Sequence, residues 1–159
     1  MNQRELSIWL KALLAVSGIL GLFLCFGLAP NVGLNLAKMD PSRKYMFWPC
    51  LIFIWIACIP IYMALYQAWM IFTNVGEDNS FCEDNMLRLK KISRLSIVVV
   101  MMYSLAAFGL LFMNLVSIYI FLAIFVILFA SIFVAVSSAV LSHLVNKAVE
   151  LKNENDLTI

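Results

Sequence analysis

Long apolar runs alternate with short polar segments along the chain, and this pattern predicts four membrane-spanning helices. Two runs are bounded by polar residues, at about 8–29 and 47–72. A third block, from Leu95 to Val145, has 51 residues without an acid, a lysine or an arginine. As one helix it would measure roughly 75 Å, more than twice the ~30 Å hydrocarbon core of a bilayer. It must therefore fold back near Asn114 and Ser117, which gives spans at 95–113 and 118–145.

Prolines and small residues add detail to these spans. Pro30 and Asn31 are expected to end the first helix, and Pro60 is expected to kink the second by removing one backbone hydrogen bond. The last helix carries a stripe of small residues, which lets a neighbouring backbone approach closely where lipid supplies no hydrophobic drive. The members of this stripe are Ser131, Ala135, Ser138 and Ser142.

The distribution of basic residues predicts the orientation. With four spans, the N-terminus, the loop 73–94 and the tail 146–159 share one side and carry eight lysines and arginines, against three in the opposite loop 30–46. The positive-inside rule then places both termini in the cytoplasm, with Trp9 and Trp69 at the inner interface and Trp48 at the outer one. A cleaved signal peptide is disfavoured, because the apolar stretch 12–29 exceeds a usual signal core and Pro30 would follow the cut.

Composition also favours an all-α integral membrane protein. We expect its single domain to be a four-helix transmembrane bundle. Hydrophobic residues make up 64% of the chain, charged residues 13%, and the formal net charge is +2. Such a balanced charge gives no reason to expect direct binding to nucleic acid. No C-x-x-C pair occurs among the cysteines, and the single histidine, His143, has no carboxylate or thiol at metal-ligand spacing. We therefore expect no metal and no cofactor.

Catalysis is not expected, because no Asp, Glu, Lys or Arg lies deep in any span. Ionisable groups are costly in a bilayer, and membrane enzymes and proton-coupled carriers keep them for function. The chain also lacks the redox cysteine pair of quinone-linked thiol oxidases and the first-helix glutamate of small multidrug carriers. A transport alternative would need a polar cavity between the helices, lined by Tyr62, Tyr66, Gln67, Tyr103 and Ser138.

The loop between the second and third spans predicts a helix that starts near Cys82 and extends the third span into the cytoplasm. Ser80 followed by Glu83 has the spacing of a capping box. Basic residues follow, while Met86, Leu89 and Ile92 keep an apolar face at helical spacing. The simplest interpretation of these charges is a topology signal that also contacts anionic lipid. The sharper hypothesis is that this helix forms half of a docking surface.

The tail supplies the other half of that surface. The residues up to Asp156 are expected to continue the last helix in a more polar register, and Leu157 and Ile159 then end the chain on apolar side chains. Pairing of the acidic tail with the basic loop would contribute only ~0–1 kcal/mol per exposed ion pair. The two terminal apolar residues would therefore need an apolar slot to hold the tail.

Two segments also carry a resemblance that covers nearly the whole chain. "GEDNSFCEDNMLRLKKI" (76–92) and the terminal "ELKNENDLTI" (150–159), joined to four spans, resemble a family of small bacterial membrane proteins catalogued as domain of unknown function 2975. The resemblance implies a bacterial cytoplasmic (inner) membrane location. Members are often encoded beside a small helix-turn-helix regulator of the Cro repressor type, which implies a soluble DNA-binding partner. The acidic segment before Phe81 departs from the family pattern and puts a loop-specific role in doubt.

The leading hypothesis is a non-enzymatic membrane protein that binds a soluble partner through its loop and tail, as an anti-regulator or sensor for such a regulator. Its alternatives are a small transporter or immunity-type protein for an apolar solute or peptide, and a purely structural membrane subunit. Assembly into a homo-oligomer is left open. The residues assigned to partner binding are Phe81, Asn85, Arg88, Leu89, Lys91, Asn155, Asp156, Leu157 and Ile159.

Overall fold

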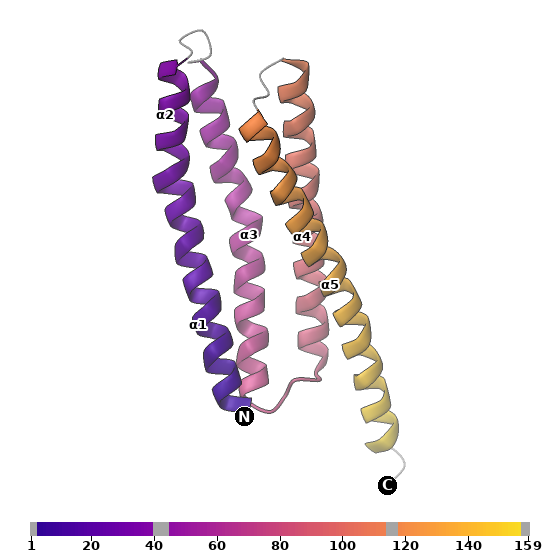
Figure 1. Ribbon diagram of the computed structural model, residues 1–159. Helices are drawn as coiled ribbons and strands as arrows, with labels where there is room; N and C mark the ends of the chain where they lie inside the picture. The colour runs from indigo at the N-terminus through magenta and orange to yellow at the C-terminus, as the bar shows by residue number, and fades with distance from the viewer. Residues whose placement is uncertain (1–2, 40–44, 114–117, 157–159) are drawn as a thin grey trace.

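The computed structural model describes residues 3–39, 45–113 and 118–156, and every regular element in these ranges is a helix (Figure 1). Four of the helical segments are long and apolar enough to cross a membrane. The start of the first helix and the end of the last lie at the same end of the molecule (Figure 1). We refer to this end as the terminal end.

The first span is longer than the sequence predicted, and the expectation that Pro30 and Asn31 end it is wrong. Helix α1 (Gln3–Leu22) continues through a π-helical segment, η1 (Phe23–Leu28), into α2 (Ala29–Met39). The N–H of Ala29 bonds to the carbonyl of Leu24, five residues back, directly before the proline. Asn31 donates its side-chain amide to the carbonyl of Gly27 at 2.8 Å. Local π geometry and side-chain donors of this kind let a membrane helix pass a proline.

Helix α3 (Phe47–Gly76) begins at the predicted residue and ends four residues beyond the predicted span. It runs through Pro60 as one continuous helix. Trp48 and Trp69 lie near its two ends, about 32 Å apart at 1.5 Å per residue. This separation matches the ~30 Å hydrocarbon core, as tryptophans at the two interfaces would require.

Helices α4 (Glu83–Phe112) and α5 (Ile118–Asp156) are both longer than their predicted spans. As expected, α4 starts next to Cys82 and α5 continues into the tail. The capping-box expectation is wrong: Cys82 occupies the N-cap position without a side-chain cap, so Glu83 is the first helical residue. The turn expected near Asn114 and Ser117 lies outside the described residues.

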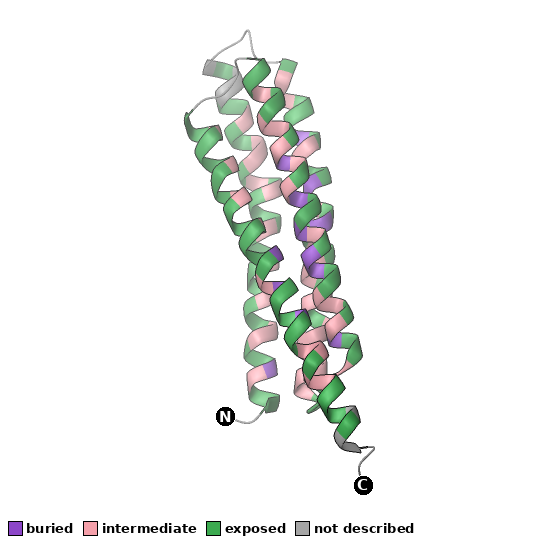
Figure 2. Cartoon of the chain, turned by 90° about the vertical axis from the view of Figure 1, so that its right-hand side faces the viewer, coloured by how far each residue is buried: buried purple, intermediate pink, exposed green. Residues whose placement is uncertain are grey.

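Each spanning helix packs against its neighbours in the sequence. The contacts between helices in the described ranges join α1 and α2 to α3, α3 to α4, and α4 to α5, and the last pair is the most extensive. In the described ranges the spanning helices therefore form an open row. Helices α1 and α5 are at its two ends, and each has one side without a neighbouring helix. Few residues are buried and exposed residues cover much of the surface (Figure 2), as expected when lipid covers the apolar outer faces.

Polar groups fix the register between neighbouring helices. Ser7 donates to the carbonyl of Phe72 at 2.5 Å and Tyr62 to that of Gly18 at 2.6 Å, which joins α1 to α3. The predicted small-residue stripe of α5 packs against α4: Ala135, Ser138 and Ser142 are all buried. A small buried core lies beside them, built on Ala57, Val99 and Tyr103.

Candidate docking surface and basic groove

The short connection between α3 and α4 is held from inside by Asn85, whose side chain is only 1% exposed. Its carbonyl oxygen accepts a hydrogen bond from the amide of Asn74 at 2.8 Å. Its own amide donates to the carbonyls of Ser80 at 2.9 Å and Asn79 at 3.3 Å. Within this connection Asp78 adopts a left-handed conformation, with φ of 59°. Asn85 was predicted to face a partner, but the structure uses its side chain to fasten the loop to α3.

The other predicted loop residues divide into half-buried and exposed ones. Arg88 is half-buried and donates from Nη1 to Oε1 of Gln67 on α3 at 3.1 Å, while its buried Nε has no hydrogen-bond partner. Leu89 is half-buried as well. Phe81, which is 59% exposed, and Lys91 are open to the surroundings. Of the five predicted loop residues, these two present their side chains most openly.

Helix α5 extends past the beginning of α4. Ser93 donates to the carbonyl of Ala135 at 2.9 Å, and Ser142 donates to that of Met86 at 3.0 Å. Both bonds have the same antiparallel register, which places Glu83, the first residue of α4, opposite Val145. Residues 146–156 therefore continue for about 16 Å beyond α4. Figure 1 shows this overhang as the lowest part of the chain.

The overhang carries exposed charged and apolar side chains together. Lys147 and Glu150 are exposed, Glu150 accepts a hydrogen bond from the Asn146 amide at 2.7 Å, and Leu151 is 66% exposed. The predicted partner residues Asn155 and Asp156 belong to α5, but their side chains, like Leu157 and Ile159, lie outside the described part of the structure.

Four polar residues of the predicted transport cavity have different surroundings in the structure. Tyr62 donates to α1, Gln67 is used by Arg88, and Tyr66 is 59% exposed. Tyr103 packs edge-on against Phe53, with ring centroids 5.4 Å apart. Neither of the two pockets described below is lined by any of the five predicted cavity residues, Ser138 included.

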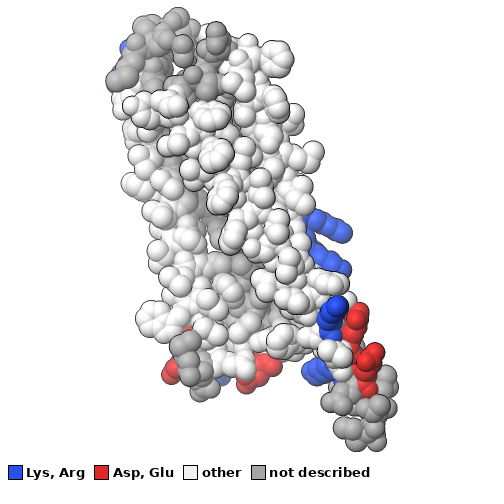
Figure 3. All heavy atoms as spheres, turned by 45° about the vertical axis from the view of Figure 1, so that its right-hand side comes forward, with Lys and Arg blue, Asp and Glu red and all other residues white. Residues whose placement is uncertain are grey.

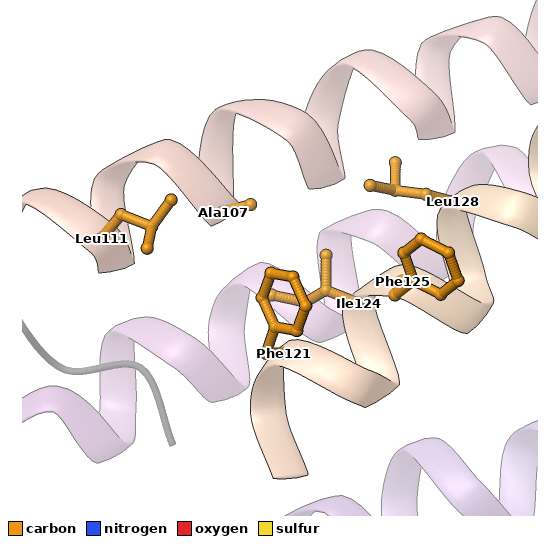
Figure 4. A pocket seen from close by; sticks show the side chains of 6 residues that line it. All are labelled: Ala107, Leu111, Phe121, Ile124, Phe125 and Leu128. Atoms are coloured by element: carbon orange, nitrogen blue, oxygen red, sulfur yellow. The ribbon is translucent and has the colours of Figure 1, made fainter. Parts of the chain in front are cut away.

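The first pocket is small and lies between the end of α4 and the start of α5. Its volume is about 80 Å³ and its walls are entirely hydrocarbon. Figure 4 shows Ala107 and Leu111 from α4 facing four side chains of α5. A pocket without a polar group cannot orient a reacting substrate. The described residues also contain no group of three or more His, Cys, Asp or Glu that could hold a metal ion.

Two thiols come together in a way that the sequence did not indicate. The side chain of Cys25, in η1, lies close to that of Cys58, in α3. Both thiols are free. They are 33 positions apart in the sequence, so only the packing of the first two spans brings them together.

The second pocket, which we name the basic groove, lies between α4 and α5 toward the terminal end. Its volume is about 400 Å³, and it is partly open. Lysine and arginine side chains project from this part of the molecule, below a large uncharged surface (Figure 3). The polar residues that line the groove are Lys90, Ser93, Arg94, Ser142, His143 and Asn146. The pattern of residues along the chain does not reveal this groove, because the residues of its two walls lie some fifty positions apart in the sequence.

Comparisons with known proteins indicate that this chain is a membrane protein. The profile of a family described as "Protein of unknown function (DUF2975)" matches residues 31–159. The chain is 32% identical over 171 residues to the "Uncharacterized membrane protein YoaS" of Bacillus subtilis (strain 168), and the alignment covers 100% of both chains. No solved structure matches the chain.

Proposed function

Because the chain belongs to the DUF2975 family of proteins of unknown function, we propose its role from its own geometry: it is a non-enzymatic membrane protein that docks a soluble protein at its terminal end. The observation that carries this proposal is the α5 overhang. Eleven residues of helix extend past α4 and present exposed charged and apolar side chains. A helix with such a surface supplies both the apolar anchor and the polar rim that a protein interface needs.

The docking surface that we propose combines the overhang with Phe81, an exposed residue of the adjacent loop. Its members are Phe81, Lys147, Glu150 and Leu151, together with the terminal residues Leu157 and Ile159. Phe81 lies two residues before α4, and the first residue of α4 is opposite Val145, so the loop and the overhang both lie at the terminal end. Asn85 is left out of this surface, because its side chain is buried.

The partner that we propose is a small helix-turn-helix regulator, held at the membrane or released when the helices change their packing. This identity rests on the family resemblance described above. The stimulus must favour one arrangement of the helices over another, since a ligand that binds both equally shifts no equilibrium. The transport alternative gains no support from the two pockets, because neither contains the polar residues that it requires.

The test is co-purification of the detergent-extracted full-length chain from its native cell, compared with a chain lacking residues 154–159. We expect the intact chain to capture a DNA-binding protein that the shortened chain does not. Leu151→Asp and the double variant Leu157→Ala, Ile159→Ala should reduce capture at least tenfold, which is the loss expected when a buried apolar anchor is removed.

The matched control is Lys38→Glu, which changes an exposed residue at the opposite end of the molecule. It should leave the capture unchanged. Equal capture by the intact and shortened chains, with no effect of Leu151→Asp, would contradict docking at this end.

A further inference from the structure

Two cations of the basic groove have no anionic partner among the residues that the structure describes. No hydrogen bond or ion pair joins Lys90 or Arg94 to another residue in the described ranges. The hydroxyl protons of Ser93 and Ser142 are committed to backbone carbonyls. The charged hydrogen-bond donors left for a ligand are therefore the Lys90 ammonium and the Arg94 guanidinium, beside the His143 ring and the second amide hydrogen of Asn146.

The groove lies at the level of the membrane interface. The Arg88–Gln67 bond places Trp69 beside the first turns of α4, within about one turn of Lys90. Lys11 of α1 lies at the same level as Trp69 of α3, since its ammonium is 5.7 Å from the centre of the Trp69 ring. Arg94 lies about 6 Å deeper, one further turn toward the middle of the span.

The direction of α4 turns these side chains toward the interface. Side chains on an α-helix tilt toward its N-terminus, and the N-terminus of α4 is at the terminal end. Lys90 and Arg94 can thus extend along the groove to the depth where lipid phosphates lie. Lys90 and Arg94 are the charged residues that line the groove, and Glu150, which accepts a hydrogen bond from Asn146, is not among the lining residues.

We propose that the basic groove binds the phosphate of an anionic phospholipid from the leaflet at the terminal end. Basic pockets between membrane helices suit such headgroups, because the lipid supplies the counter-charge within the interface. A bidentate contact from a guanidinium and a point contact from an ammonium match the oxygens of one phosphate. The proposal does not depend on the docked protein proposed above.

The test uses the purified full-length chain in phosphatidylcholine nanodiscs, with phosphatidylglycerol of the same acyl chains added in increasing amounts. Native mass spectrometry measures how many phosphatidylglycerol molecules each chain retains, and thermal unfolding measures the stabilisation. We expect retention of at least one molecule by the natural chain. Lys90→Gln, Arg94→Gln should bind about thirtyfold more weakly, since each cation near the surface contributes about one kcal/mol.

The matched control, Lys91→Gln, Lys152→Gln, removes the same charge from exposed positions outside the groove. A second variant, Ala139→Phe, fills the groove without changing any charge, because Ala139 also lines it. Loss of lipid in both groove variants, with retention in the control, supports the proposal. Equal loss in the control, or full retention in both groove variants, would overturn it.

Inorganic phosphate is the separate arm that identifies the source of the anion. We expect no stabilisation by inorganic phosphate at concentrations that far exceed those of the lipid. If inorganic phosphate stabilises the natural chain as strongly as phosphatidylglycerol does, and the groove variants lose this effect, the site takes a soluble phosphate and the lipid proposal is wrong.

Discussion

Asn85 shows how one side chain can join separate parts of a small membrane protein. It is nearly inaccessible, and it bonds to α3 through Asn74 and to two carbonyls of the connecting loop. A buried side-chain amide with several hydrogen-bond partners contributes more to stability than an exposed one, because its removal leaves those partners buried without a hydrogen bond. The stability of the α3–α4 connection should therefore depend on Asn85 far more than on its exposed neighbours.

Asn85→Ala is expected to destabilise the protein by about 1–3 kcal/mol, because it leaves the Asn74 amide and two carbonyls without this partner. Thermal unfolding in detergent, followed by helical circular dichroism, measures the effect. The control is Phe81→Ala, which removes an exposed ring from the same loop and should change stability by about 0.5 kcal/mol or less. Similar unfolding temperatures for the two variants would show that the network is not holding the loop.

Close approach of helices depends on a different residue, Gly76 at the end of α3. A Cβ atom added there would lie 2.8 Å from Oγ and 3.0 Å from Cβ of Ser7. Ser7 is buried and hydrogen-bonded to the carbonyl of Phe72, so it has little freedom to move. Only a residue without a side chain lets α1 and α3 meet at this point.

Gly76→Ala is expected to cost about 1–3 kcal/mol, since it overpacks the contact between α1 and α3. Gly18→Ala is the control within the same helix pair, because an added Cβ there meets nothing within 4 Å. Detergent unfolding of the two variants gives the comparison. An unfolding temperature for Gly76→Ala equal to that for Gly18→Ala would mean that Ser7 relaxes without cost.

At the scale of the element, the apolar runs predicted the existence and order of the spans well, but several boundaries less well. The break expected at Pro30 did not occur, because the backbone before it winds as a π-helix, which residue composition does not reveal. The basic groove was also hidden: Lys90 and His143 become neighbours only through the register that two serine hydroxyls set between α4 and α5. Likewise, helical spacing alone gave no sign that Asn85 is buried.

For the whole molecule, the structure places the start of α1 and the end of α5 at the same end, and the basic residues predict that this end is cytoplasmic. Green fluorescent protein fused to either terminus should fluoresce, because it folds in the cytoplasm. Alkaline phosphatase inserted at 40–44 should be active, because it requires the outer side. The reverse result, with active phosphatase at the termini, would contradict the orientation that we expect from the eight basic residues.

The open row of helices has a consequence for biosynthesis. In the described ranges, the helix contacts join only spans that are adjacent in the sequence, so each span after the first meets its neighbour soon after it is synthesised. No span has to wait in the bilayer for a distant partner, and the topology is of the local kind that folds quickly. A chain interrupted after α3 would already contain a complete, paired hairpin, and the second hairpin would add to its edge. Nascent chains arrested at successive lengths should therefore acquire protease resistance hairpin by hairpin rather than all at once.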